Sequence, residues 1–174
     1  IAPNSPHIMW TKPLQEGGVV GGLYSIAEGV TFYPGLSYQG RMANTLIMNG
    51  RVYYDSPLSD HPTLGPYMCI DLQTGETIWT NEAIAPAFGQ LYDYESMNQH
   101  GVIPDGFLWQ VAGSTWIASD PRTGAWLFNL TGVPGGTTVY GPNGEILRYQ
   151  LSYNRTSNTG WLALWNNTAA PGLA

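Results

Sequence analysis

Apolar and aromatic residues occur along the chain in short runs that alternate with polar residues. Glycine, proline, asparagine and aspartate separate these runs, and this pattern is typical of β-strands with one buried face. Asn49-Gly50 lies between two such runs and predicts a hairpin closed by a type I′ turn. Two further runs follow, so we expect four consecutive antiparallel strands, at 45–48, 51–54, 67–71 and 76–80.

The same pattern predicts two more sets of strands. The second set has four members, at 100–103, 107–111, 115–120 and 125–129. The third set has three, at 137–140, 146–153 and 161–165. Four-stranded antiparallel units repeated every 40–50 residues or so are typical of the blades of a β-propeller.

A turn motif recurs within these sets. Its form is Asp-x-x-Thr-Gly followed by a strand with an aromatic residue, and its two full copies are Asp71, Thr74, Gly75, Trp79 and Asp120, Thr123, Gly124, Phe128. The aspartate is expected to accept backbone hydrogen bonds that close the turn, and the glycine to supply a positive φ. A degenerate third copy ends at Thr168, and we interpret all these residues as structural.

Composition agrees with an all-β fold. The 174 residues include 22 glycines and 13 prolines, and 13% of the chain is aromatic. Charged residues make up 10%, against about 25% in an average domain, so long helices stabilised by salt bridges are excluded. With 43% hydrophobic residues the chain can form a packed core.

The charge distribution excludes two classes of partner. The net charge is −6, and Lys12 is the only lysine. Because the five arginines are scattered, no basic surface is available to neutralise phosphates, and binding to nucleic acid or anionic lipid is not expected. No apolar stretch approaches the roughly 20 residues that span a bilayer, and no signal peptide is recognised.

The repeats predict about three blades in an incomplete ring. We expect residues 1–11 to supply the fourth strand of a preceding or closing blade and 12–44 to form a Gly-rich insertion. The blades themselves are expected at 45–80, 81–129 and, in part, 130–168, with a tail at 169–174. Since propellers have four to eight blades, the expected partners are the rest of a longer parent chain or further copies joined through open strand edges.

The Asp-x-x-Thr-Gly-x-x-x-Trp repeat resembles that of the PQQ-like (pyrroloquinoline-quinone) β-propeller superfamily. The segments 92–96, 98–101 and 140–145 are similar to uncharacterised large secreted prokaryotic, chiefly archaeal, proteins. This resemblance implies a propeller fold and an extracellular or cell-surface setting, and it implies no single activity. PQQ sites in that superfamily use a vicinal disulfide, which a chain with one cysteine cannot form.

The strongest candidate ligand site lies between two blades. In an extended segment Asp93 and Glu95 share one side and the tyrosines share the other, and the candidate residues are Tyr92, Asp93, Tyr94, Glu95, Asn98 and His100. The carboxylates could bind Ca²⁺ or act as an acid–base pair on a glycoside, and the tyrosines could stack on sugar rings. The alternative is that the tyrosines pack and the acids face water.

Other residues favour structural interpretations. Cys69 falls in a strand pattern and is expected to be a buried thiol. Five tryptophans are expected between blades, namely Trp109, Trp116, Trp126, Trp161 and Trp165. Three Asn-x-Thr sequons are candidates for glycosylation, at Asn129, Asn154 and Asn166.

The sequence therefore predicts a non-catalytic extracytoplasmic module that is a scaffold or a binding surface for protein or glycan. The alternative is a carbohydrate-active enzyme or sugar-binding site built on Asp93 and Glu95. A PQQ-dependent dehydrogenase is the less favoured enzyme, and no cofactor other than Ca²⁺ is expected.

Overall fold

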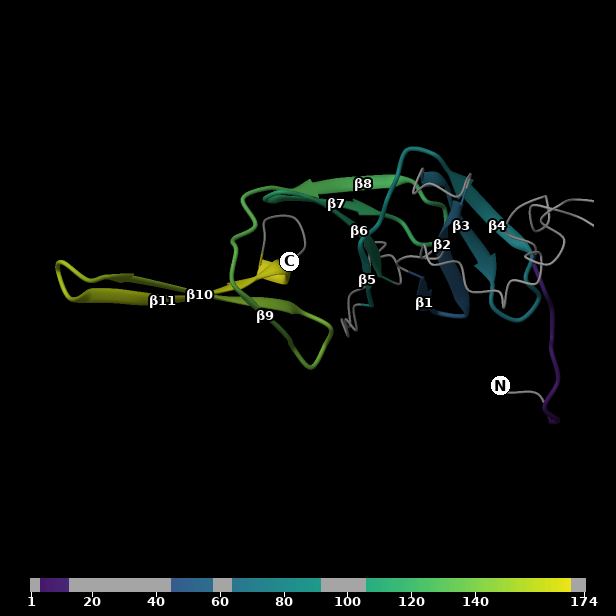
Figure 1. Cartoon of the computed structure of the whole chain (residues 1–174), viewed down its shortest axis with the longest axis horizontal. Helices are drawn as coiled ribbons and strands as arrows, with labels where there is room; N and C mark the ends of the chain where they lie inside the picture. The colour runs from purple at the N-terminus through teal and green to yellow at the C-terminus, as the bar shows by residue number, and fades with distance from the viewer. Residues whose placement is uncertain (1–3, 13–44, 58–63, 92–105, 170–174) are drawn as a thin grey trace, which may run out of the picture. The chain divides into compact units, whose positions relative to one another are not determined.

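The computed structural model describes residues 4–12, 45–57, 64–91 and 106–169 (Figure 1). The chain divides into two compact units, Ile1–Ala85 and Pro86–Ala174. The described strands form three separate antiparallel sheets of four, four and three strands. The expected all-β class is therefore confirmed. In the part of the chain that the structure describes, no helix has the length and apolar character needed to cross a membrane.

The first unit contains one sheet with strand order β1-β2-β3-β4. Asn49 and Gly50 join the first two strands with φ values of 45° and 71°, as the predicted type I′ turn requires. A bulge between Cys69 and Ile70 shifts the register against the last strand. The strands are β1 (Leu46–Met48), β2 (Arg51–Pro57), β3 (Leu64–Asp71) and β4 (Thr77–Asn81).

The second unit contains two sheets, of order β5-β6-β7-β8 and β11-β10-β9. The first strand of the four-stranded sheet lies at Phe88–Gln90, which the sequence analysis missed, and the expected strand at 100–103 lies outside the described residues. The other strands are β6 (Phe107–Ala112), β7 (Thr115–Ser119), β8 (Trp126–Leu130), β9 (Thr137–Tyr140), β10 (Ile146–Asn154) and β11 (Thr159–Asn166).

Each copy of the turn motif connects the third and fourth strands of its sheet. Asp71 Oδ1 accepts the backbone N–H groups of Gln73 and Thr74, both at 2.8 Å. Gly75 has a φ of +73°, and its N–H donates to the carbonyl of Asp71 at 2.9 Å. The N–H of Thr74, followed by that of Gln73, holds the pKa of Asp71 below its ordinary value.

The second copy has the same geometry. Asp120 Oδ1 accepts the N–H of Arg122 at 2.7 Å, and Gly124 donates to the carbonyl of Asp120 at 2.8 Å with a φ of +71°. The degenerate third copy differs, because the chain at Asn167–Ala169 forms a short 3-10 helix instead. The two four-stranded sheets therefore carry equivalent turns at equivalent places.

The aromatic residue of each motif packs within its own unit. Trp79 is half-buried, and its ring lies 6.0 Å from that of Tyr53. Phe128 makes an edge-on contact with Phe107 at 5.5 Å. The contact of Trp79 lies in the first unit, and that of Phe128 belongs to the core of the second unit.

The core of the second unit lies between its two sheets. Trp109 and Trp116 are buried at its centre, and Trp165 of the third sheet makes an edge-on contact with Trp116 at 5.7 Å. The guanidinium of Arg148 lies 4.7 Å from the centroid of the Trp116 ring, which is within the range of a cation–π contact. One face of the third sheet therefore packs on the second sheet.

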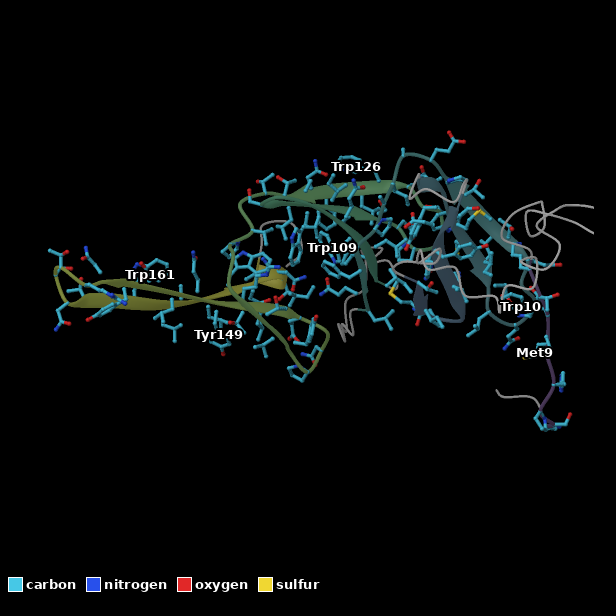
Figure 2. All side chains as sticks on the ribbon, in the orientation of Figure 1. Met9, Trp10, Trp109, Trp126, Tyr149 and Trp161 are labelled. Carbon is cyan, nitrogen blue, oxygen red and sulfur yellow. The ribbon has the colours of Figure 1, made fainter. Side chains whose placement is uncertain are left out.

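Two of the five tryptophans expected in the core are not buried. Trp126 is 64% exposed and Trp161 is 51% exposed. Trp126 lies on β8, an edge strand, and Trp161 lies on a part of β11 that extends beyond the core (Figure 2). The expectation was wrong for these two, because an aromatic residue in a strand is buried only where a second layer covers it.

The N-terminal segment differs from the strand expected within residues 1–11. Residues 4–12 form no strand. Trp10 instead packs against the buried cluster of Val52, Tyr54 and Ile70, and its indole N–H donates to the carbonyl of Leu72 at 3.0 Å. Lys12 Nζ also donates to the carbonyl of Gly75 at 3.0 Å. The segment is thus held through side chains, and its backbone pairs with no strand of the described sheets.

Candidate functional site

The candidate ligand site inferred from the sequence lies outside the described residues. This holds for all six of its members, Tyr92, Asp93, Tyr94, Glu95, Asn98 and His100. Within the described ranges, no group of three or more His, Cys, Asp or Glu side chains could hold a metal ion. Two other features of the described chain have the properties of interaction or reactive sites.

The first feature is a hairpin with little support. β10 and β11 pair from Leu147↔Asn166 to Asn154↔Thr159 and form one long hairpin (Figure 1). Only Ile146, Leu147 and Arg148 of β10 are buried or half-buried, and only Trp165 and Asn166 of β11. From Tyr149 to Leu164 the hairpin is exposed on both faces. Two-stranded ribbons are marginally stable in water on their own, so this part of the hairpin is suited to contact with another surface.

One face of this hairpin is almost entirely apolar. The register places Tyr149 opposite Leu164 and Leu151 opposite Leu162, so these side chains share a face. We call this surface the open face, and its members are Val139, Tyr149, Leu151, Tyr153, Leu162 and Leu164. Their exposed fractions run from 41% for Tyr149 to 74% for Leu151. The open face is opposite to the face that carries Arg148 and Trp165 to the core.

Contiguous exposed apolar surface of this kind marks a site of interaction. The open face also borders an edge, because β11 is the outermost strand of its sheet. An edge strand presents unpaired backbone N–H and C=O groups to which another strand can add. Residues 146–169 contain Arg148 and Arg155 and no acidic residue, although acids outnumber bases twelve to six in the whole chain. The hairpin thus combines apolar contact area, an open edge and a weak positive charge.

The second feature is a row of polar pairs across β2 and β3. Arg51 lies opposite Asp71, Tyr53 opposite Cys69 and Asp55 opposite Tyr67, all on one face of the first sheet. Tyr53, Tyr67 and Cys69 are fully buried. Such a row of titratable groups is the place in the described chain to look for catalytic chemistry.

The pKa directions oppose nucleophilic catalysis in this row. Burial raises the pKa of Cys69 to about 11, so the thiol is protonated at neutral pH and is a poor nucleophile. Burial also raises the pKa of Tyr67, with the charge of Asp55 as the next cause. The expectation of a buried thiol at position 69 is confirmed. The row therefore resembles a packed polar interior more than an activated site.

One pair in the row leaves hydrogen-bonding capacity unused. Asp55 Oδ1 and the Tyr67 hydroxyl are buried, and neither has a hydrogen-bond partner in the part of the chain that the structure describes. Burial raises the pKa of Asp55. Burying these two polar atoms without hydrogen-bond partners among the described residues is expected to destabilise the fold.

The three sequons occupy different environments. Asn129 lies on the edge strand β8, and its Oδ1 accepts the indole N–H of Trp126 at 2.9 Å. Asn154 is exposed at the end of β10, where its Oδ1 accepts the N–H of Thr156 at 2.9 Å. Asn166 is half-buried, and its Oδ1 accepts both the N–H and the hydroxyl of Thr168. The sequence pattern alone does not distinguish these environments.

The open face was not identified by sequence reasoning. The signal was present, since Leu147, Tyr149, Leu151 and Tyr153 alternate with polar residues along one strand. Alternation of this kind predicts a strand with one buried face. The pattern does not show whether a second layer covers that face.

Comparison with known proteins adds no assignment. No protein-family model matches the chain, and no curated protein matches it.

Proposed function

We propose that this protein is a non-catalytic extracytoplasmic β-propeller module in which the open face of the third sheet binds a further β-sheet. The single observation that carries the proposal is the exposed apolar open face of a three-stranded sheet that packs on the core only at its base, through Ile146 and Trp165. A blade inside a propeller has a neighbour on each face. The exposed face is therefore the surface that a next blade would cover.

The repeat geometry supports the blade interpretation. The two four-stranded sheets have the same sequential strand order, and each carries an Asp-x-x-Thr-Gly turn between its third and fourth strands. The third sheet has the same sequential order, and it has three strands among the residues that the structure describes. The further sheet would come from the rest of a longer parent chain or from another copy, and a strand added to β11 would complete the third blade.

The energetics favour covering the open face. Burying one large apolar side chain contributes about 1.5–3 kcal/mol, and six such residues form this surface. Assembly also offers hydrogen-bond partners to the backbone of β11. A scaffold or a binding surface needs these two properties and no catalytic group. The extracytoplasmic setting rests on the family resemblance of the turn repeats.

A second candidate function is a carbohydrate-active enzyme or a sugar-binding site that uses Asp93 and Glu95. It is favoured by the pairing of two carboxylates with Tyr92 and Tyr94 in one short segment. A PQQ-dependent dehydrogenase is a weaker proposal, because a single cysteine cannot supply the vicinal disulfide of such sites.

Binding of a hydrophobic dye tests the proposal. The wild-type chain should enhance the fluorescence of an anilinonaphthalene dye, and Leu151→Ser with Leu162→Ser should lose most of that enhancement. The matched control is Gln150→Ser with Ala163→Ser, which alters the cross-strand pair on the opposite face and should keep the signal. Equal dye binding by both variants would show that the open face is not the apolar surface that binds the dye, and it would contradict the proposal.

Calorimetry separates the functional classes. The scaffold proposal predicts no heat with PQQ, Ca²⁺ or an oligosaccharide panel. Heat with oligosaccharides that disappears in Asp93→Asn with Glu95→Gln would favour the carbohydrate-active alternative. Heat with PQQ would favour the dehydrogenase.

A further inference from the structure

The two most exposed tryptophans each lie beside the asparagine of a sequon. Trp126 is 64% exposed and Trp161 is 51% exposed, while Trp109 and Trp116 are fully buried. The three other described tryptophans are half-buried. An exposed indole does not contribute the free energy of burial by which a tryptophan usually stabilises a fold. A reason for these two positions is therefore required, and each has the same neighbour.

At the first position a β-bulge brings the two side chains together. The register of β7 and β8 pairs Ile117 with Asn129 and Ser119 with Trp126, and it shifts between Ala118 and Ser119. Residues three apart on a regular strand point to opposite faces. The bulge places Trp126 and Asn129 on the same face, where the indole N–H donates to Asn129 Oδ1 at 2.9 Å.

At the second position regular pairing has the same effect. Ser152 lies opposite Trp161, and Asn154 lies opposite Thr159, so Trp161 and Asn154 share a face of the hairpin. This is the face opposite to Tyr149 (Figure 2). They are diagonal neighbours, a spacing that a long aromatic side chain can reach across. Asn154 Oδ1 accepts the N–H groups of Thr156 and Ser157, so these bonds engage the oxygen and not the amide nitrogen.

The third sequon has the opposite character. Asn166 Oδ1 accepts the hydroxyl of Thr168 at 2.9 Å and its N–H at 3.0 Å. Both residues are half-buried, and Asn167 between them is 1% exposed and bonded within the core. The adjacent Trp165 packs on Trp116. An enzyme that must reach the amide and the hydroxyl of this sequon would first have to unfold the segment Asn166–Ala169.

We propose that Asn129 and Asn154 are N-glycosylation sites whose first sugar rests on Trp126 and Trp161, and that Asn166 is not modified in the folded protein. The inference depends on the extracytoplasmic setting proposed above, where sequons are glycosylated. In the reaction, the amide nitrogen of each asparagine forms a bond to the anomeric carbon of a lipid diphosphate-linked oligosaccharide. The bond from that carbon to the phosphate oxygen breaks, the lipid diphosphate leaves, and the amide releases one proton.

The exposed indoles then have a function. The C–H groups of one pyranose face are apolar, and the face of an indole is the most extended apolar surface that a side chain offers. A sugar linked to Asn154 would cover surface that Trp161 otherwise leaves in water, and Asn129 and Trp126 repeat the arrangement on another sheet. The glycan would be ordered at its first residue, which stabilises the folded protein.

Glycosylation in vitro tests the site assignment. The purified folded chain is incubated with an oligosaccharyltransferase and its lipid-linked donor, and occupancy is measured by mass spectrometry of glycopeptides. Asn129 and Asn154 should be occupied at least about tenfold faster than Asn166, because access to Asn166 needs local unfolding. A synthetic peptide of residues 162–170 is the control and should be modified readily. Modification of Asn166 in the folded chain at the rate of the others would overturn the proposal.

A second measurement tests the role of the tryptophans. The glycan on wild-type protein should raise the Tm relative to the unglycosylated chain, and Trp126→Ala with Trp161→Ala should abolish that increase while leaving both sites occupied. The same increase in both proteins would overturn the contact with the indoles. Protein from its native source distinguishes the two proposals. Occupancy in vitro with no glycan on the native protein would contradict the extracytoplasmic setting and not the accessibility of the sites.

Discussion

The side-chain amide of Asn167 donates a hydrogen bond to Oε1 of Gln90 at 3.0 Å, although 77 positions separate the two residues. The same oxygen accepts the indole N–H of Trp109 at 2.8 Å. Asn167 Oδ1 accepts the N–H of Ile146 at 2.7 Å, and Gln90 Nε2 donates to the carbonyl of Gly144. Gln90, Trp109 and Asn167 are all buried. This network joins the two sheets of the second unit at the end where the third sheet is supported.

Substitution of Asn167 should destabilise the second unit. Asn167→Leu leaves the N–H of Ile146 without its partner, and a buried unsatisfied group costs about 1–3 kcal/mol. We expect a loss in that range in the free energy of unfolding, measured with urea. The control Gln150→Ala removes an exposed amide and should change it by less than about 0.5 kcal/mol. Equal effects of the two substitutions would contradict the importance of the network.

Two glycines with nearly equal φ values form a second test. Gly50 has a φ of +71° and an added Cβ would meet nothing within 4 Å, whereas a Cβ on Gly75, at +73°, would lie 2.6 Å from Trp10 Cδ2. Gly50→Ala and Gly75→Ala should each lower the free energy of unfolding by about 1 kcal/mol, because alanine is strained at a positive φ. Gly75→Ala should also displace Trp10, which a change in tryptophan fluorescence would report. The same emission spectrum for both variants would contradict the observed contact.

Asp55 should make stability decrease as pH rises. Burial raises its pKa in the folded state, so protons bind more tightly to the folded than to the unfolded chain. The contribution of Asp55 protonation to the free energy of unfolding is complete below the pKa of the unfolded chain, about 3.9. It is lost as pH rises through the pKa of the folded chain. The free energy of unfolding of wild type minus that of Asp55→Asn should therefore fall as pH rises above about 4.

Asp71 should show the opposite dependence. The N–H groups of Thr74 and Gln73 lower its pKa, so its contribution is present above the unfolded value, about 3.9, and is lost as pH falls through the folded pKa. The free energy of unfolding of wild type minus that of Asp71→Asn should decrease on acidification below pH 4. Urea unfolding at several pH values measures both differences, and the same sign of slope for both residues would contradict these assignments.

The β10–β11 hairpin should exchange its amide hydrogens unevenly. Its base contacts the core through Ile146 and Trp165, whereas the part from Tyr149 to Leu164 is exposed. Segments with few buried contacts open at low free energy. Hydrogen-exchange mass spectrometry should give faster exchange for peptides within 149–164 than for peptides of β6 and β7. Uniform protection across these strands would show that the hairpin is more stable than its contacts suggest.

Local patterns predicted much of this fold. Asn49-Gly50 gave the first hairpin, and the Asp71 and Asp120 motifs gave the positions of two turns, because each depends on residues within five positions of one another. The short strand at Phe88–Gln90 was missed, since three residues are too few to show a period. The expected burial of Trp126 and Trp161 was wrong, because burial depends on whether a second sheet covers a strand and not on the strand itself.

The candidate site was less predictable than the fold. The carboxylates at Asp93 and Glu95 lie outside the described residues, and their role stays a prediction. The Gln90–Asn167 bond and the pairing of tryptophans with sequons depend on register and on a bulge, which no periodicity reveals. Alternation along β10 gave the strand and its apolar face, and only the arrangement of the sheets distinguishes an exposed face from a core.

Sedimentation velocity over a range of concentrations measures whether the open face binds a second sheet. The wild type is compared with a variant that carries Leu151→Ser, Leu162→Ser and Leu164→Ser. In the purified chain the sheet available to cover the open face is that of another copy. We therefore predict concentration-dependent association of the wild type and a monomer for the variant. A wild type that sediments as a monomer at every concentration, indistinguishable from the variant, would show that the open face does not bind a further sheet.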